Sequence, residues 1–376
     1  MTFGFDSIKI NSESPTNEMV HNAILNSYNN ENVSSDYQNI IEKVLSSYSK
    51  KLNNEVLAED DFILTDHELN EFKTQEEKDI IRYVVYRYKY NTYPKIKKVS
   101  DYPPNLQIEL SSICNLRCVM CYQADKTFSG KSNGFMGYMK FDLFKKIIDE
   151  VEGNIDGLTF ASRGEPTLIK DFDKYLKYCE GKFLGLKINT NVTLFNEKLI
   201  NTLLSSDIQT LVLSIDESNK ENYEKIRVNA KFDKIMKNLE MLREIREKNY
   251  KNSKLKVRIS GVKINKDQNI DEINKFYKDF ADEIALVNYT PWESSYENEV
   301  NQISDPCSDL FRRMFIWWDG KANPCDYDYK SILSKWDAKF LTVKEIWNSN
   351  YYNEIRFKHL NNMRDEIEPC KRCIAT

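Results

Sequence analysis

The stretch Ser111-Ser112-Ile113-Cys114-Asn115-Leu116-Arg117-Cys118-Val119-Met120-Cys121-Tyr122 decides the fold, because it holds three cysteines spaced Cys-x3-Cys-x2-Cys. Four thiolates normally hold a cubane iron–sulfur cluster. A cluster on Cys114, Cys118 and Cys121 therefore has one iron without a protein ligand, and that iron can bind a small molecule. Residues 106–110 read as a strand that runs directly into this stretch. Parallel α/β sheets and barrels bind their ligands at this end of their strands, so the stretch predicts an iron–sulfur site there.

The spacing leaves two alternatives for these cysteines, a zinc site and plain buried thiols. Zinc sites usually combine two Cys-x2-Cys pairs, or cysteines with histidines. A run of three cysteines does not follow that pattern, and the three histidines of the chain, His21, His67 and His359, lie far apart in the sequence. The iron–sulfur interpretation is therefore favoured.

Length and composition are those of a globular enzyme with two to three domains, since the chain has 376 residues of which 41% are hydrophobic. Its 54 basic and 58 acidic residues give a net charge of -4, which argues against a nucleic-acid partner. No apolar run approaches the ~20 residues of a membrane helix, and the first six residues lack the basic and apolar regions of a signal peptide. We expect a cytoplasmic protein with neither a nucleic-acid nor a membrane partner.

Strand-like and helix-like segments alternate between about residue 100 and residue 290. Strands are predicted at 106–110, 157–161, 184–189, 209–216, 255–262 and 284–289. Strands separated by helices imply an α/β fold with a parallel sheet and right-handed crossovers.

Residues 1 to 95 have apolar residues at helical spacing and predict a mostly helical N-terminal region. Capping-box patterns at Thr65 and Thr74 each predict the start of a helix. Pro94 and the pair Pro103-Pro104 mark the boundary to the alternating part.

The remaining cysteines divide into one isolated residue and a C-terminal group of four. Cys179 lies in a helical pattern and reads as a small core hydrophobe. The other four are Cys307, Cys325, Cys370 and Cys373. Disulfides are not expected in a reducing cytoplasm, and four thiolates can ligate either a complete cubane cluster or a structural zinc ion. Residues 315–318, followed by Asp-Gly, predict a β-hairpin within this part.

The run of three cysteines, together with the segments after it, resembles the signature of the radical SAM superfamily. In that superfamily the amino and carboxylate groups of S-adenosylmethionine (SAM) chelate the open iron, and the core is a partial (β/α)6 barrel. The C-terminal cysteines resemble the auxiliary-cluster modules called SPASM or, when shortened, twitch. The resemblance implies a helical N-terminal region at 1–95, a core barrel at 96–295 and a SPASM/twitch-like module at 296–376. That module would hold a second [4Fe–4S] cluster, with zinc as the alternative.

The resemblance extends to the stretch Ser162-Arg163-Gly164-Glu165-Pro166, which stands where the family has a Gly-Gly-Glu-Pro-like segment that holds the methionine amino group. Arg163 departs from that pattern. Arginine is costly if the backbone there needs a positive φ, and its side chain is a hypothetical substrate anchor.

Further contacts with SAM are carried over from the family. Ser214 and Arg227 resemble positions that meet the ribose or the carboxylate, and Met120 matches an apolar position beside the adenine. The cofactor contacts implied by the resemblance are Met120, Tyr122, Gly164, Glu165, Pro166, Asn191, Ser214, Arg227 and Val262.

The resemblance implies an enzyme that reductively cleaves SAM to a 5′-deoxyadenosyl radical, which abstracts hydrogen from a substrate, with flavodoxin or ferredoxin as reductant. The leading prediction is oxidation of a small polar substrate, a sugar or an aminosugar, because one fully ligated auxiliary cluster can accept an electron. The alternative is a peptide-modifying maturase, for cross-linking or epimerisation, that docks its peptide on residues 1–95. A non-enzymatic iron–sulfur or zinc protein is a third class.

Candidates for a catalytic side chain are Arg163, Glu293, Asp326 and Asp328, and the sequence does not rank them.

Overall fold

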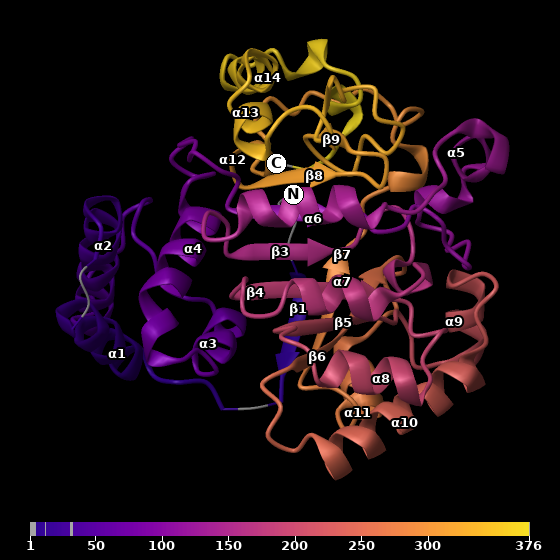
Figure 1. Ribbon diagram of the computed structural model, residues 1–376, viewed down its shortest axis with the longest axis horizontal. Coiled ribbons are helices and arrows are strands. Elements are labelled where there is room, and N and C mark those ends of the chain that lie inside the picture. The colour runs from indigo at the N-terminus through magenta and orange to yellow at the C-terminus, as the bar shows by residue number, and fades with distance from the viewer. Residues whose placement is uncertain (1–4, 12, 31–32, 376) are drawn as a thin grey trace.

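The computed structural model describes residues 5–11, 13–30 and 33–375 and shows a mixed α/β protein (Figure 1). The start of the chain, where the sequence shows no signal-peptide pattern, lies largely outside the described residues. One sheet contains the strands in the order β1-β7-β6-β5-β4-β3-β2-β8-β9-β10. The strands are β1 (Phe5–Ile10), β2 (Asn105–Ile108), β3 (Gly157–Phe160), β4 (Gly185–Thr190), β5 (Thr210–Ser214), β6 (Lys256–Lys263), β7 (Glu283–Asn288), β8 (Arg313–Ile316), β9 (Lys321–Asn323) and β10 (Trp336–Asp337).

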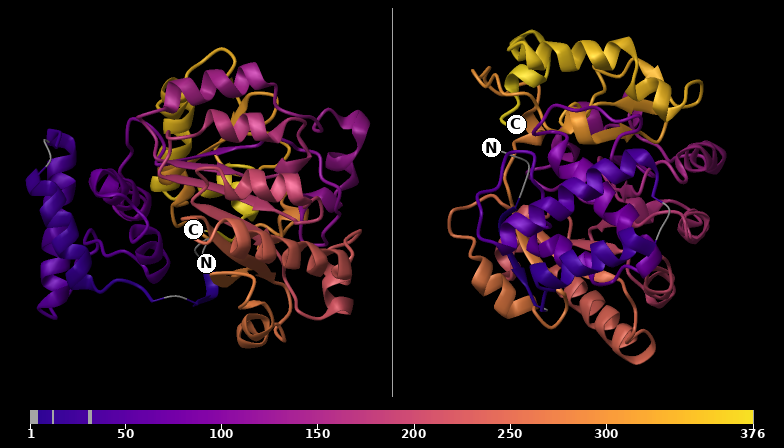
Figure 2. Two further views of the ribbon diagram at one scale, coloured as in Figure 1. Left: turned by 60° about the horizontal axis from the view of Figure 1, so that its bottom comes forward. Right: turned by 90° about the vertical axis from the view of Figure 1, so that its left-hand side faces the viewer.

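Six parallel strands, β2 to β7, form the centre of the sheet and confirm the six predicted strands. The strand order begins at β1 and ends at β10, so the barrel is open. The β-strands of the core are covered by helices on their outer side (Figures 1 and 2). The apolar face of α6 (Phe141–Val151) is typical, because Phe144, Ile147, Ile148 and Val151 are all buried in the main core. This spacing is the one that predicts an amphipathic helix.

The helices follow in chain order. They are α1 (Asn17–Asn30), α2 (Ser35–Leu52), α3 (Asp66–Phe72), α4 (Ile80–Thr92), α5 (Lys126–Ser129), α6, α7 (Phe172–Tyr178), α8 (Glu197–Leu204), α9 (Lys220–Ile226), α10 (Phe232–Asn249), α11 (Ile270–Tyr277), α12 (Asp309–Arg312), α13 (Val343–Trp347) and α14 (Asn350–Leu360), and the short 3-10 helices are η1 (Glu77–Asp79), η2 (Tyr122–Ala124), η3 (Lys131–Asn133), η4 (Pro166–Leu168), η5 (Trp292–Ser294), η6 (Arg364–Glu366) and η7 (Cys370–Arg372). No helix within the described ranges is long and apolar enough to cross a membrane.

The N-terminal region is mostly helical and has an apolar core of its own, built mainly from α1, α2 and α4. Helices α1 and α2 lie to one side of the sheet, with α3 and α4 between them and the strands (Figure 1). The region also contributes a strand that the sequence analysis did not predict, because β1 pairs antiparallel with β7. This short edge strand is stabilised by pairing with a strand more than 270 positions along the chain. The local sequence alone therefore does not predict it.

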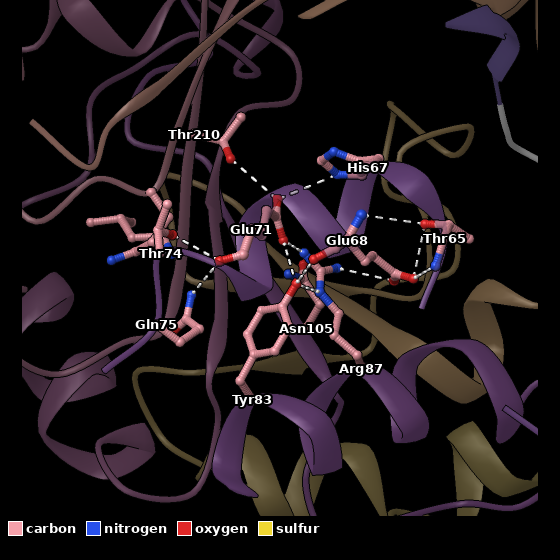
Figure 3. Close-up of polar contacts among 12 residues, drawn as sticks. Thr65, His67, Glu68, Glu71, Thr74, Gln75, Tyr83, Arg87, Asn105 and Thr210 are labelled. Carbon is pink, nitrogen blue, oxygen red and sulfur yellow. Dashed lines mark hydrogen bonds and ion pairs between the residues drawn. The ribbon is translucent and has the colours of Figure 1, made fainter. Parts of the chain in front are cut away.

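One of the two predicted capping boxes is present. Thr65 accepts a hydrogen bond from the backbone N–H of Glu68, whose carboxylate accepts one from the N–H of Thr65 (Figure 3). The prediction of a second box at Thr74 is wrong. The hydroxyl of Thr74 donates to Glu71 O and so ends α3, and α4 begins later, at Ile80.

The C-terminal part extends the same sheet. Strand β8 pairs parallel with β2, and β9 pairs antiparallel with β8, which confirms the predicted hairpin. Its turn requires a glycine, because Gly320 has φ +91 and a Cβ there would lie 2.5 Å from the carboxylate of Asp337.

A buried ionic network joins the N-terminal helices to the bottom of the barrel (Figure 3). Glu71 of α3 forms an ion pair with Arg87 of α4 and accepts hydrogen bonds from the hydroxyls of Tyr83 and Thr210. All four side chains belong to buried residues. Loss of either partner of this ion pair would strongly destabilise the fold, because it would leave a buried charge without a counter-charge.

We expect Arg87→Leu to lower the free energy of unfolding by about 3–5 kcal/mol, because it leaves the buried carboxylate of Glu71 without its cation. Urea denaturation of the variant measures this. The control Lys248→Leu removes an exposed cation from α10 and should change stability by less than about 0.5 kcal/mol. Equal stability of both variants would contradict a stabilising role of the network.

Candidate functional site

A cavity of about 800 Å³ occupies the inside of the barrel. Each strand from β2 to β8 contributes at least one residue to the lining. Strands β4, β5 and β6 contribute several, whereas β3 and β8 contribute only Thr159 and Arg313, and β7 contributes Val287 and Asn288 at its end. Alternate residues of a strand point to the same face, which is why Thr210, Val212 and Ser214 of β5 all line the cavity. The inner face of the sheet is therefore the wall of a single cavity.

The three cysteines of the 111–122 stretch line one end of this cavity. The stretch follows β2 and is held by backbone hydrogen bonds from Arg117 N to Val228 O and from Val119 N to Ile226 O. The side chain of Gln123 closes the loop by donating to Ser112 O at 2.7 Å and to Arg163 O at 2.5 Å. Residues far apart in the sequence thus fix the shape of the cysteine loop.

Burial raises the pKa of the thiols of Cys114, Cys118 and Cys121, in the case of Cys114 to about 12. A buried thiolate is stable only beside a positive charge. The iron ions of a cluster supply that charge, and cysteines bind them after losing their protons. The donor set of Cys114, Cys118 and Cys121 therefore fits the cluster that the sequence predicts.

The stretch after β3 packs directly against the cysteine loop. Glu165 N donates to Ile113 O at 2.9 Å, and a Cβ atom on Gly164 would lie only 2.3 Å from Ser111 O. The close approach of two backbones explains the glycine. The condition under which an arginine would be costly is not met, because Arg163 has no positive φ; the positive φ of this segment lies at Ser162, with φ 123.

The carboxylate of Glu165 lies beside the same loop and is buried. It accepts hydrogen bonds from the hydroxyls of Thr167 and Thr190, at 2.6 and 2.8 Å, and from Asn191 N at 2.7 Å. Burial is the largest cause that raises its pKa. A carboxylate fixed in this way, on the wall of the cavity, suits an ammonium group such as the one of a methionine moiety.

Asn191 and Pro166 occupy different positions relative to the cavity. The amide nitrogen of Asn191 donates to the side chain of Asn115 at 2.9 Å and lies 3.8 Å from Cys114 Sγ. Pro166 is buried at the start of η4. Asn191 lines the cavity, and Pro166 does not.

Arg227 is buried and not a surface charge. Its guanidinium contacts the carboxylate of Asp216 at 2.5 and 3.0 Å, and one nitrogen lies 3.8 Å from Cys118 Sγ. Asp216 also accepts from Val262 N at 2.8 Å. Sequence reasoning missed Asp216, although a polar residue just after a strand of a parallel sheet is a recognisable signal.

The other predicted cofactor contacts, Met120, Tyr122, Ser214 and Val262, line the same cavity. Tyr122 stacks on Trp292 with ring centroids 6.0 Å apart and an interplanar angle of 13°. All predicted cofactor contacts except Pro166 therefore line the cavity, and their assignment to parts of SAM stays a prediction.

Arg163 and Asp326 are the two candidate catalytic residues that line the cavity. The guanidinium of Arg163 forms two hydrogen bonds of 2.6 Å with Glu109 and one of 2.9 Å with Tyr329 O. Three of its five N–H groups are thus used within the protein, which makes it a link between β2 and the C-terminal part rather than a free anchor. Burial raises the pKa of Asp326 to about 6.

The other two candidates have partners in the protein. Asp328 accepts hydrogen bonds from the hydroxyl of Tyr296 at 2.6 Å and from two backbone N–H groups, those of Ile332 and Leu333. Glu293 accepts a hydrogen bond from the hydroxyl of Tyr289. These hydrogen bonds do not favour either Asp328 or Glu293 as a catalytic group.

The four C-terminal cysteines come together although the chain separates them. Cys307 and Cys370 pack against one apolar cluster, and Cys325 and Cys373 belong to a second. Burial raises the pKa of each thiol, and the charges of the other three thiols raise the pKa of Cys325 further. Within the described residues no three Cys, His, Asp or Glu side chains are placed to hold one metal ion. Each thiolate of a cubane binds a different iron, so cluster ligands stand further apart than the ligands of a single ion.

Arg364 holds the last two of these cysteines in place, and sequence reasoning did not find it. It is 1% exposed, and its guanidinium donates to Cys370 O at 3.1 Å, Cys373 O at 2.6 Å and Ala375 O at 2.7 Å. A single arginine side chain therefore gathers the carbonyls of the terminal loop.

Comparison with protein families agrees with this arrangement. Residues 108–277 match the radical SAM superfamily, and residues 307–374 match SPASM, an iron–sulfur cluster-binding domain. The chain therefore belongs to the radical SAM superfamily and carries a C-terminal SPASM domain. Its cofactors are accordingly a [4Fe–4S] cluster, SAM and auxiliary iron–sulfur ligation.

Curated relatives match over part of their length. The uncharacterized protein MJ0804 of Methanocaldococcus jannaschii is 26% identical over 36% of this chain and 42% of its own. The tungsten-containing aldehyde ferredoxin oxidoreductase cofactor-modifying protein of Pyrococcus furiosus is 31% identical over 30% of each chain. The GTP 3',8-cyclase of Clostridium botulinum is 25% identical over 46% of this chain and 50% of its own. The chain thus spans half or less of the length of these relatives.

Two solved structures share the fold. Native anSMEcpe with bound AdoMet has a TM-score of 0.52 and 19% identity, and the match covers 72% of this chain and 87% of that one. SuiB of Streptococcus suis bound to S-adenosylmethionine has a TM-score of 0.50 and 16% identity, covering 95% and 90%. At these identities the likeness concerns the fold alone.

We expect Gly164→Ala to lower the iron content from about eight to about four per chain, since two cubanes contain four irons each. The added Cβ would meet Ser111 O at 2.3 Å and Ser112 C at 2.5 Å, which are backbone atoms that cannot rotate away. Iron and sulfide analysis after anaerobic reconstitution measures this. The control Gly134→Ala changes an exposed glycine with φ +79 whose added Cβ meets nothing within 4 Å. It strains only a surface turn and should keep about eight irons. Full iron in Gly164→Ala would contradict the position of the first cluster.

Arg364→Met should lose the auxiliary cluster and keep the first one, because it releases the carbonyls of Cys370 and Cys373. The iron content should fall to about four per chain, while reductive cleavage of SAM under dithionite continues. Lys371→Met is the matched control, since Lys371 lies between the same cysteines, is partly exposed and pairs with Glu368 at 3.5 Å. A loss of SAM cleavage in Arg364→Met would show that the two sites are not independent.

Proposed function

We propose that this enzyme oxidises a small polar substrate, a sugar or an aminosugar, at a carbon that bears a hydroxyl group. The observation that carries the proposal is that the four C-terminal cysteines lie next to the cavity that the first three cysteines line. Asp326, which follows Cys325, and Ala375, which lies two residues after Cys373, are both part of the cavity wall.

When bound, the first cluster and SAM supply a 5′-deoxyadenosyl radical that abstracts a hydrogen atom. A carbinol carbon that has lost a hydrogen atom must lose one more electron and one proton before it becomes a ketone. Four cysteines ligate a cubane completely, so Cys307, Cys325, Cys370 and Cys373 would hold a group that accepts an electron without binding the substrate.

The residues of the chain then have three tasks. Glu165, Asn191 and Arg227 surround the cysteine end and would bind and orient SAM there. The barrel wall encloses the substrate and excludes water and oxygen from a reactive species. Asp326 places a carboxylate on the wall next to the auxiliary cysteines, where it could accept the hydroxyl proton. The reductant that reduces the first cluster would be a flavodoxin or a ferredoxin.

A second candidate function is peptide modification by cross-linking or epimerisation. It is favoured by the separate apolar core of the N-terminal helices, which could form a docking unit. The solved SuiB structure bound to its precursor peptide SuiA has a similar fold, with a TM-score of 0.50. Deletion of residues 1–95 is not a clean test of docking, because β1 pairs with β7 and Glu71 reaches Thr210 of the barrel.

The test is transfer of deuterium from a substrate carbinol into 5′-deoxyadenosine, with formation of a carbonyl product. The probes are glucose, glucosamine, glucuronate and glucose 6-phosphate, each deuterated at its carbinol carbons, with SAM and dithionite. We expect transfer from at least one probe. Transfer from none of them, together with transfer from backbone-deuterated peptides, would favour the second candidate.

Cys325→Ala tests the electron-accepting role. It should leave SAM cleavage intact and stop carbonyl formation, because the substrate radical has lost its electron acceptor. Cys179→Ala is the control, since Cys179 is a buried thiol at the end of α7, away from the cavity lining. Carbonyl formation at the wild-type rate in Cys325→Ala would contradict the proposed oxidation.

A further inference from the structure

Cations and carboxylates both line the end of the cavity opposite the cysteines, the carboxylates being Asp66, Glu68, Glu71 and Asp309. Five cationic side chains line it, and we call this part of the cavity the cationic chamber. They are Arg87, Lys187, Arg258, Arg312 and Arg313.

Each arginine of the chamber has a carboxylate partner in the protein. Arg87 pairs with Glu71, and Arg258 pairs with Glu283 at 2.8 Å. Arg312 and Arg313 share Asp309, at 2.8 and 3.8 Å. The charges of these arginines are therefore compensated before any ligand binds.

Lys187 is different. Within the described part of the chain, its ammonium has no hydrogen-bond or ion-pair partner. Its neighbours on the adjacent strands are Thr159 of β3 and Thr210 of β5, which carry no charge. The residue is partly exposed only because it faces the cavity. Burial, followed by the charges of the arginines, lowers the pKa of Lys187 well below its usual value.

An unpaired ammonium inside a barrel is costly, since a buried charge needs a partner. Packing does not explain a lysine at this position, because the side chain of Lys187 lines the open volume of the cavity. An anion placed against it would supply the missing partner and would also be attracted by the guanidinium groups around it.

We propose that the cationic chamber binds an anionic group of the substrate, a carboxylate or a phosphate, with the ammonium of Lys187 as its main partner. The same cavity contains Lys187 and the three cysteines of the first cluster. A substrate anchored by its anion in the chamber therefore extends toward the reactive end. The inference rests on the proposed function, which it deepens: it favours an anionic sugar over an aminosugar.

The test is binding of anions to the SAM-loaded protein without reductant, so that it does not depend on catalysis. The probes are inorganic phosphate, malonate, glucose 6-phosphate, glucuronate and glucosamine, titrated at constant ionic strength and followed by thermal shift and calorimetry. We expect phosphate or carboxylate compounds to bind and glucosamine not to bind. The comparison of phosphate with malonate, and of glucose 6-phosphate with glucuronate, distinguishes the two anions.

Lys187→Met should weaken binding of the preferred anion roughly tenfold or more, the loss expected for a charged hydrogen bond. Lys187→Arg should bind within about threefold of wild type, because it keeps a cation in the chamber. Lys198→Met removes an exposed lysine of α8 and should bind like wild type.

Stability of the unliganded variant provides a second readout. Lys187→Met should be at least as stable as wild type, because an apolar side chain of similar size replaces an unpaired cation. The proposal is overturned if Lys187→Met binds anions like wild type, if no anion binds better than chloride, or if glucosamine binds best. Anion binding at Lys187 without sugar oxidation would retain this inference and reject the proposed reaction alone.

Discussion

The buried ion pair between Glu109 and Arg163 is the interaction on which the arrangement of the site depends. Glu109 directly follows strand β2 and stands two residues before the cysteine stretch, and Arg163 belongs to the segment that packs on that stretch. Arg163 also donates to Tyr329 O, and Trp318 N donates to Glu109 at 3.3 Å. The pair thus joins the loop of the first cluster, the Gly164-Glu165 segment and the SPASM domain. Removing two charges from water is expensive, so the pair is better understood as a device that fixes geometry than as a source of stability.

The cavity has two chemically different ends, and the sheet explains why they are separate. In a parallel barrel all strands point the same way, so loops with cofactor ligands gather at the carboxyl ends. Here the amino ends are covered by α3 and α4, whose ionic side chains Glu71 and Arg87 enter the bottom of the barrel (Figure 3). The N-terminal region is therefore joined to the barrel twice, through these side chains and through its strand β1, which pairs with β7.

Sequence reasoning was most successful where the relevant signal is local. The six core strands, the capping box at Thr65 and the hairpin of β8 and β9 each depend on residues within a few positions of one another, and all are present. The second capping box failed because Thr74 closes α3 instead of opening α4. The cysteine spacings predicted the two domains that family comparison identifies.

The sequence by itself determined the class of chemistry, because three cysteines in eight residues and four more in the last seventy leave few alternatives to iron–sulfur ligation. Only the tertiary structure decided which side chains serve one another. The pairs Asp216 with Arg227 and Glu109 with Arg163, and the contacts of Arg364 with the terminal carbonyls, depend on residues that the fold brings together. Lys187, which has no partner among the described residues, depends on residues that the fold keeps apart. The physical reason is that periodicity and spacing describe the chain locally, whereas a buried charge is governed by whatever side chains surround it in space.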